Sequence, residues 1–109
     1  MHKDEIPPGT LCLLILKALA RHGELHGYEI ANWIEQVSED VLQVEEGSLY
    51  PALQRMLVKG WVTAKWGVTA GNRRARYYRL TTLGRKQLEV EVSQFERVMQ
   101  AIARAIQTA

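Results

Sequence analysis

Arginine is concentrated in one short stretch of the chain. Four of the seven residues from 73 to 79 are arginines, namely Arg73, Arg74, Arg76 and Arg79. Guanidinium groups bind phosphate oxygens through charge-assisted and often bidentate hydrogen bonds. A phosphate polyanion adds a second driving force, because cations that neutralise its charges release condensed counterions. The chemistry that this stretch indicates is the binding of a polyanion.

The acidic residues avoid the same part of the chain. No Asp or Glu occurs between Glu46 and Glu89, and the net charge of +2 hides this asymmetry. From the sequence we interpret the basic charges of this span as locally uncompensated, which favours an acidic partner. The span contains nine basic residues, which are Arg55, Lys59, Lys65, Arg73, Arg74, Arg76, Arg79, Arg85 and Lys86.

Residues for other kinds of chemistry are scarce. The chain offers no recognisable set of nucleophile, base and charge stabiliser, so we expect no catalytic residues and no cofactor. His2, His22 and His26 have no metal-ligand spacing with a cysteine or carboxylate, and we expect no metal site. The single cysteine, Cys12, lies among leucines, which excludes a disulfide and predicts a core residue.

Length and hydropathy predict one soluble domain. The chain has 109 residues, of which 47% are hydrophobic and 24% charged, as in ordinary globular proteins. The longest apolar stretch, residues 11–16, is far shorter than the roughly 20 residues that cross a bilayer. Asp4 and Glu5 also disagree with the basic start of a signal peptide. We therefore expect no membrane association and a cytoplasmic location.

Apolar residues at helical spacing predict three helices before the arginine stretch. The first covers residues 8–22, since Pro8 suits a first turn and Gly23 suits a helix end. The second covers residues 27–37. Pro51 also belongs in a first turn, so the third helix is predicted to begin near Gly47 or Ser48 and to end at Gly60. Its buried stripe is Leu49, Leu53, Met56 and Leu57.

The arginines then fall in a predicted β-hairpin. Residues 61–66 and 77–80 are rich in β-branched and aromatic side chains, and a loop at 68–73 joins them. Tyr78 alternates with Leu80 and is predicted to face the core, whereas Tyr77 shares the opposite face with Arg79. Tryptophans can be core residues or ligand stackers, and we expect at least two of Trp33, Trp61 and Trp66 in the core.

The last predicted helix follows Thr81, which suits an N-cap. Its apolar residues are spaced 4, 3, 4, 3 and 4, which is an a/d heptad pattern. This apolar stripe is larger than the helix needs for packing against its own domain. We therefore interpret the helix as a dimerisation helix. The predicted dimer-interface residues are Leu88, Val92, Phe95, Met99, Ile102 and Ile106.

Three helices followed by a basic hairpin is the element order of a winged helix-turn-helix module. In such modules the third helix enters the major groove of DNA and the hairpin contacts the flanking backbone. The predicted fold class is mainly α (α+β), with a winged helix-turn-helix domain over residues 1–80 and a dimerisation helix over 81–109. The expected partner is double-stranded DNA.

The candidate DNA contacts follow from this arrangement. Side chains at the start of the third helix would face base edges, and glutamine can pair with adenine. The alternative is that Tyr50 packs across the second helix and that Gln54 is only solvated. Hairpin arginines would contact phosphates or the minor groove, or merely keep the hairpin soluble. The predicted DNA-binding residues are Ser48, Tyr50, Gln54, Arg55, Asn72, Arg73, Arg74, Arg76 and Tyr77.

Three segments carry a family resemblance. Residues 46–53 (EGSLYPAL), residues 73–81 (RRARYYRLT) with Gly84, and residues 25–30 (LHGYEI) resemble the PadR family of bacterial transcriptional regulators. The resemblance implies a homodimeric repressor whose C-terminal helix packs across the dimer and which a small aromatic or hydrophobic effector releases from DNA.

The resemblance also implies where an effector would bind. The chain is similar to the short members with one C-terminal helix, some of which bind flat hydrophobic drugs between the last helices through a central tryptophan. Phe95 stands about where that residue would be, and Met99 lies one turn later. These two are the candidate effector residues. The alternative is that Phe95 serves only as an interface core residue.

Two functions are compatible with these features of the sequence. The leading hypothesis is sequence-specific binding of an inverted-repeat operator by a homodimer that regulates transcription. The alternative is a winged-helix module for protein contacts without DNA binding, in which the basic hairpin docks on an acidic surface. The alternative would be favoured if the protein were a monomer, bound one protein partner and did not bind DNA.

Overall fold

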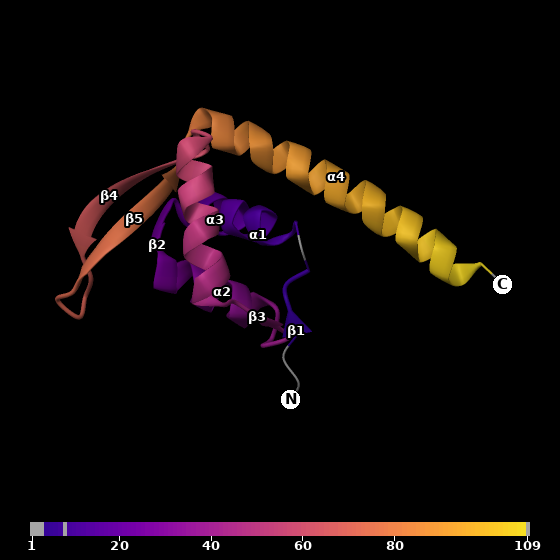
Figure 1. Cartoon of the computed structure of the whole chain (residues 1–109), viewed down its shortest axis with the longest axis horizontal. Helices are drawn as coiled ribbons and strands as arrows, with labels where there is room; N and C mark the ends of the chain where they lie inside the picture. Colours follow the sequence, from indigo (N-terminus) through magenta and orange to yellow (C-terminus); the bar gives the residue numbers. More distant parts are fainter. Residues whose placement is uncertain (1–3, 8, 109) are drawn as a thin grey trace.

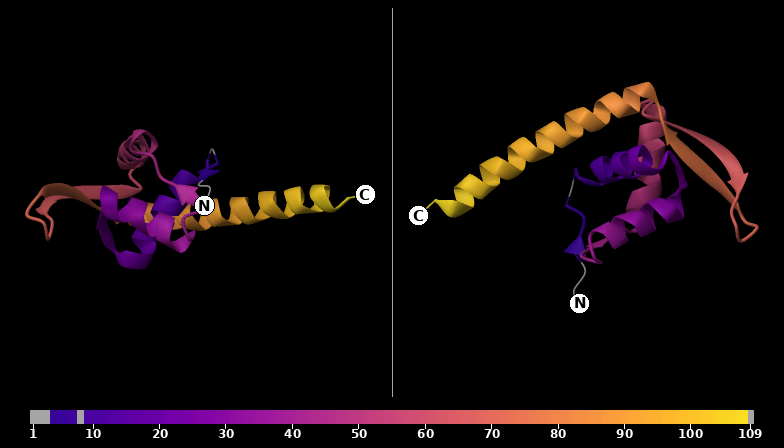
Figure 2. Two further views of the ribbon diagram at one scale, coloured as in Figure 1. Left: turned by 90° about the horizontal axis from the view of Figure 1, so that it is seen from below. Right: turned by 180° about the vertical axis from the view of Figure 1, so that it is seen from behind.

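The computed structural model describes residues 4–7 and 9–108, with side chains at 6–7 and 9–108. Helices and a small sheet form one body, and a long last helix extends from it (Figure 1). Figure 2 shows from two further sides that the β-hairpin and this helix leave the body in opposite directions. Among the described residues, we find no helix with the length and apolar character needed to span a membrane.

Three amphipathic helices build the core. They are α1 (Leu11–His22), α2 (Gly27–Val37) and α3 (Glu46–Val58). Each helix buries one apolar stripe and exposes its polar side, as helical periodicity predicts. The largest fully buried side chains are Ile15, Leu16, Leu19, Ile30, Ile34, Leu49, Leu53 and Met56. The predicted stripe of the third helix is therefore confirmed, with Leu57 only half-buried.

Helix α2 begins at Gly27 as predicted, whereas the starts of α1 and α3 differ from the prediction by one to three residues. Helix α1 begins at Leu11, because Gly9 has a φ of +85° and forms a turn with Thr10. Pro8, the predicted start, lies outside the described residues. Helix α3 begins at Glu46 rather than Gly47 or Ser48, which puts Pro51 in the second turn. Pro51 has no N–H to donate to the Gly47 carbonyl, so the helix lacks one backbone hydrogen bond near its start.

The predicted hairpin is confirmed and is longer than expected. It consists of β4 (Val62–Val68) and β5 (Arg74–Leu80), which pair antiparallel. A third strand, β2 (Glu24–His26), pairs antiparallel with β5, so the strand order is β2-β5-β4. Strand β2 was not predicted. Two short segments, β1 (Asp4–Glu5) and β3 (Leu42–Gln43), form a separate parallel pair.

The register of the hairpin separates its two faces. Val62 pairs with Leu80 and Ala64 pairs with Tyr78, which places these residues on the inner face, against the helices. Tyr78 is 5% exposed, which confirms its predicted core role. Side chains two residues further along each strand remain on the same face. The inner face therefore continues outward from the core to Trp66 and Arg76.

Helix α4 (Thr82–Gln107) follows β5 directly. Thr81 caps it as predicted, since its Oγ1 accepts a hydrogen bond from the Gly84 N–H (3.0 Å) and donates one to the Gly60 carbonyl (2.6 Å). With 26 residues the helix is about 39 Å long. It packs against α1 and β5 near its start, where Leu88 contacts the core, and every residue from 93 to 108 is exposed.

Gly84 joins this helix to the core and cannot be enlarged without cost. It is buried, and a Cβ atom at this position would overlap the backbone carbonyl of Trp61. We expect Gly84→Ala to lower the free energy of unfolding by about 1–3 kcal/mol, because the backbone must shift to make room. Thermal or denaturant unfolding measures the effect.

Gly47→Ala is the matched control. Gly47 also lies in a helix, but a Cβ atom there meets nothing within 4 Å. Because alanine restricts the unfolded chain, this variant should be as stable as the wild type or up to about 1 kcal/mol more stable. Equal stability of the two variants would contradict the close packing of α4 on Trp61.

Candidate nucleic-acid interface

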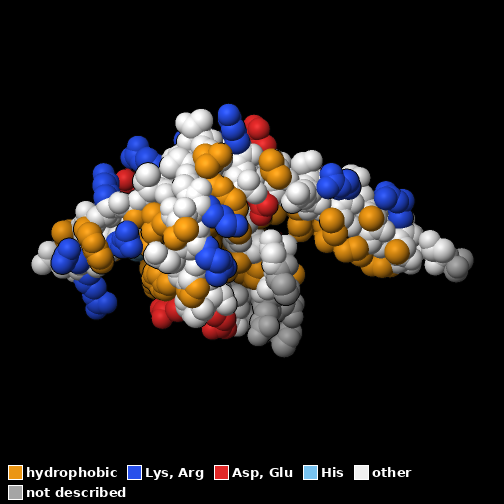
Figure 3. Space-filling view, turned by 45° about the horizontal axis from the view of Figure 1, so that its top comes forward, with side chains coloured by type: hydrophobic (Ala, Val, Ile, Leu, Met, Phe, Trp, Pro, Cys, Tyr) orange, Lys and Arg blue, Asp and Glu red, His pale blue; other side chains and the backbone are white. Residues whose placement is uncertain are grey.

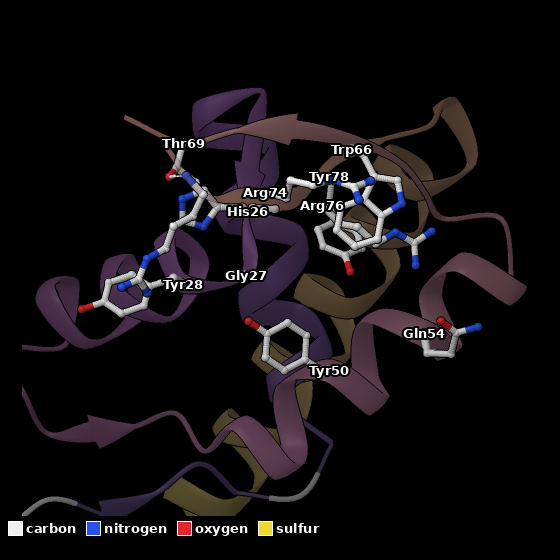
Figure 4. A pocket seen from close by; sticks show the side chains of 12 residues that line it. His26, Gly27, Tyr28, Tyr50, Gln54, Trp66, Thr69, Arg74, Arg76 and Tyr78 are labelled. Carbon is white, nitrogen blue, oxygen red and sulfur yellow. Dashed lines mark hydrogen bonds between the residues drawn. The ribbon is translucent and has the colours of Figure 1, made fainter. Parts of the chain in front are cut away.

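A concave cleft separates the inner face of the hairpin from the helices (Figure 4). Its volume is about 870 Å³, and it opens to solvent. The first residues of α2 and the exposed side of α3 form the opposite wall. The lining combines aromatic rings with cations, namely Tyr28, Tyr50, Trp66, Tyr78, Arg73, Arg74 and Arg76. This set of side chains suits an anionic ligand with apolar surfaces.

On the hairpin side, two arginines lie over one tryptophan. The guanidinium carbons of Arg74 and Arg76 are 4.7 Å and 5.8 Å from the ring centroid of Trp66. Both contacts are within the distance at which a cation is attracted to an aromatic face. Trp66 is 60% exposed and is the one of the three tryptophans that lies outside the core. Trp33 and Trp61 pack against the core, as expected for two of the three.

On the helical side, Tyr50 projects from α3 toward the first residue of α2. A Cβ atom on Gly27 would lie 2.8 Å from the Tyr50 ring, so this close approach requires glycine. Tyr50 is nevertheless 47% exposed and lines the cleft. It therefore packs across α2 and faces the cleft at the same time. Gln54 lies one turn further along α3 and is exposed at the cleft wall.

Hydrogen bonds of a capping box fix the start of α2. The backbone N–H of Glu29 donates to Nδ1 of His26 (3.4 Å), and the N–H of His26 donates to Oε1 of Glu29 (3.0 Å). The His26 ring also packs edge-on against Tyr77 of β5, with centroids 5.3 Å apart. Helix α2 and the hairpin are thus held together at the base of the cleft, which explains the residue types at 26 and 29.

The outer face of the hairpin has a different charge balance. Strand β2 brings Glu24 to within 3.4 Å of both Lys65 and Arg79. The interpretation that all nine basic charges of the span are locally uncompensated was therefore wrong for these two. The sequence did not reveal this contact, because Glu24 is far from Lys65 and Arg79 along the chain. It approaches them only because β2 pairs with β5. The free positive charge of the hairpin lies on its inner face and its loop.

Tyr77 lies on the outer face with Arg79, as predicted. Its ring covers Gly67, and its hydroxyl donates to the Val68 carbonyl (3.5 Å). In the loop, Thr69 accepts a hydrogen bond from the Arg73 N–H (3.2 Å), and Asn72 has a φ of +61°. Asparagine tolerates this left-handed conformation better than most residues. The loop thus places Arg73 at the edge of the cleft.

The structure does not gather all predicted contacts of α3 into the cleft. Tyr50 and Gln54 line the cleft, whereas Ser48 and Arg55 line a second hollow of about 460 Å³ on another side of the helix. This hollow lies between α3 and the segment around Ile6. Ser48 and Arg55 are exposed there.

The remaining predicted residues lie on α4. Phe95, Met99, Ile102 and Ile106 are exposed by 38% to 77%, while Leu88 and Val92 are half-buried. Figure 3 shows apolar side chains gathered along one side of this helix and basic ones on another. The effector candidates, Phe95 and Met99, belong to the exposed part.

Burial raises the pKa of two side chains in the described part of the chain. Cys12 is half-buried, and burial together with the nearby Glu91 carboxylate raises the pKa of its thiol to about 11. Burial also raises the pKa of Tyr78. Within residues 4–7 and 9–108, no group of three or more His, Cys, Asp or Glu side chains is placed to hold a metal ion.

Sequence comparison finds a family match over most of the chain. The model of the transcriptional regulator PadR-like family matches residues 15–90. An uncharacterized protein from Lysinibacillus sphaericus is 29% identical over 102 residues, which cover 94% of this chain and 93% of that protein.

Solved structures with the same fold include regulators from two other bacteria. A transcriptional regulator from Clostridium thermocellum is 27% identical with a TM-score of 0.80, over 88% of this chain and 92% of that one. Bacillus subtilis PadR, in complex with operator DNA, is 26% identical with a TM-score of 0.67, over 79% of this chain and 48% of that longer one. These neighbours confirm the predicted α+β winged helix-turn-helix fold.

Proposed function

Because the chain belongs to the PadR-like family of transcriptional regulators, we propose that it binds a specific duplex DNA sequence. The observation that carries the proposal is the cleft. Arg74 and Arg76 on the hairpin line this cleft together with Tyr50 and Gln54 on α3, so phosphate-binding and base-reading side chains are presented on one concave surface. The match to a PadR structure bound to operator DNA gives independent support.

In this proposal α3 enters the major groove. Gln54 reads base edges, with contributions from Ser48 and Tyr50, and Arg55 contacts the backbone. Ser48 and Arg55 lie on a different side of the helix from the cleft. A helix within a groove presents more than one side to the DNA, so the two sets of residues contact different strands.

The hairpin contacts the adjacent minor groove or its phosphates. Asn72 and Arg73 in the loop, and Arg74 and Arg76 on the inner face, make these contacts, and the Tyr77 hydroxyl lies at the hairpin edge. Lys65 and Arg79 contribute less, because each is within 3.4 Å of the Glu24 carboxylate.

We further propose that the protein is a homodimer, with residues 1–80 as the DNA-binding unit and 81–109 as the dimerisation helix. The exposed stripe on α4 supports this, since Phe95, Met99 and Ile102 are apolar, in heptad spacing and uncovered by their own chain. Leu88 and Val92 sit partly in the monomer core and join the stripe at its start. Two copies would read half-sites about 34 Å apart.

We propose, finally, that the protein represses transcription until a small hydrophobic or aromatic effector releases it from DNA. The effector would bind beside Phe95 and Met99, where exposed aromatic and thioether surfaces on two α4 helices provide an apolar site. Binding there would change the spacing of the two DNA-binding units.

Paired charge variants test the DNA interface. Arg74→Gln with Arg76→Gln should weaken binding to every duplex, because two phosphate contacts are lost. The slope of log K against log salt between about 50 and 200 mM should become shallower by about 1.8. Fluorescence anisotropy with a labelled random-sequence duplex measures both quantities.

Lys65→Gln with Arg79→Gln is the matched control. It removes the same charge from the outer face, where Glu24 already compensates it. The slope should change by much less than in the inner-face variant. Equal changes would contradict the cleft as the DNA-binding surface. If the DNA affinity of the wild-type protein did not change with salt concentration, that result would contradict binding by counterion release. It would favour the protein-contact module.

A charge in the α4 stripe tests the dimer. Ile102→Glu should weaken dimerisation by at least about 100-fold, because the interface would bury an unpaired carboxylate. Gln100→Glu adds the same group on a different side of the helix and should leave the dimer intact. Sedimentation equilibrium distinguishes them. A wild-type monomer, or dissociation in both variants, would contradict the proposed interface.

A flat hydrophobic dye tests the effector site. The wild type should bind the dye with enhanced fluorescence and should lose DNA affinity as the dye binds. Phe95→Ala should bind it roughly tenfold more weakly, because an aromatic contact surface is lost. Val37→Ala removes an exposed apolar side chain from α2 and should have no effect. Dye binding that leaves DNA affinity unchanged would exclude effector release through this site.

A further inference from the structure

We propose that Trp66 is a positioning residue, which holds Arg74 and Arg76 at the mouth of the cleft as one preformed unit. This inference rests on the proposed DNA-binding function and deepens it. Within that function, the two arginines bind DNA well because the tryptophan restrains them before the DNA arrives.

The hairpin register creates the unit. Trp66 pairs directly with Arg76 across the two strands, and Arg74 pairs with Val68, two residues along β4 on the same face. Each guanidinium is therefore next to the indole ring, at 4.7 Å for Arg74 and 5.8 Å for Arg76. Cross-strand neighbours at these positions are close enough for long side chains to interact.

Burial of Arg76 supports a restrained side chain. Its Nε atom is shielded from solvent, and no described residue offers it a hydrogen-bond acceptor. A freely extended arginine would keep this nitrogen in water. Arg76 is thus half-buried, and its guanidinium lies beside the Trp66 ring (Figure 4).

The positioning role also explains why Trp66 is exposed. At 60% exposure the ring contributes little to the core, whereas the equivalent inner-face residues Val62 and Tyr78 are buried. An exposed aromatic ring within reach of two cations attracts both and offsets part of the repulsion between them. Restraint also lowers the rotamer entropy that each arginine loses when it binds a phosphate. Both effects raise affinity without adding a charge.

A positioning role has a signature in the salt dependence. The slope of log K against log salt reports how many phosphates the protein neutralises. Loss of Trp66 leaves both arginines in place, so affinity should fall at every salt concentration while the slope stays the same. Loss of an arginine changes the slope itself.

The experiment compares two replacements of Trp66. Isoleucine keeps a side chain that favours β-structure but has no aromatic ring, while phenylalanine keeps a ring. We expect Trp66→Ile to bind a random-sequence duplex roughly 5- to 30-fold more weakly with an unchanged salt slope. Trp66→Phe should remain within about threefold of the wild type. Circular dichroism melting shows that each variant is folded at the temperature of the binding assay.

A double-mutant cycle separates positioning from direct contact. In the background of Arg74→Gln with Arg76→Gln, Trp66→Ile should change affinity less than about twofold, because no cation remains to be held. The same loss in both backgrounds would mean that Trp66 contacts DNA itself, which overturns the inference. Wild-type affinity in Trp66→Ile also overturns it and leaves the proposed function intact. A wild-type chain without DNA affinity would overturn the proposed function instead.

Discussion

The antiparallel register of β4 and β5 is the constraint on which the site depends. Leu80 and Tyr78 are anchored in the core, and strand geometry then puts Arg76 and Arg74 on the same face, beyond the edge of the helices. A slip of one residue would turn these arginines to the outer face and bury Arg79 instead. The hydrophobic core therefore fixes the direction of the basic residues as well as the stability of the domain.

Electrostatics divides the hairpin in the same way. A chain with a net charge of +2 has little overall attraction for a polyanion, so the position of each charge matters more than the sum. Strand β2 contributes Glu24 to the outer face, which leaves the inner face and the loop as the positive surface. The cleft and the free charge thus occupy the same side of the sheet.

Much of this was predictable from the sequence, and the failures have physical causes. Period-two alternation identified Tyr78 as a core residue. The threonine at position 81, a residue type that suits an N-cap, identified the start of the last helix. Strand β2 escaped prediction because three residues carry no periodic pattern and pair only through tertiary contact. The exposure of Trp66 depends on how far the hairpin extends past α3, which no local pattern encodes.

The proposed function is sequence-specific DNA binding by a symmetric pair of chains. Selection of bound duplexes from a random pool, followed by sequencing, measures this specificity and its symmetry. We expect enrichment of a short inverted repeat whose half-site centres lie about one helical turn, roughly 34 Å, apart. A selected pool with no shared sequence, or with a shared sequence that lacks two-fold symmetry, would contradict it.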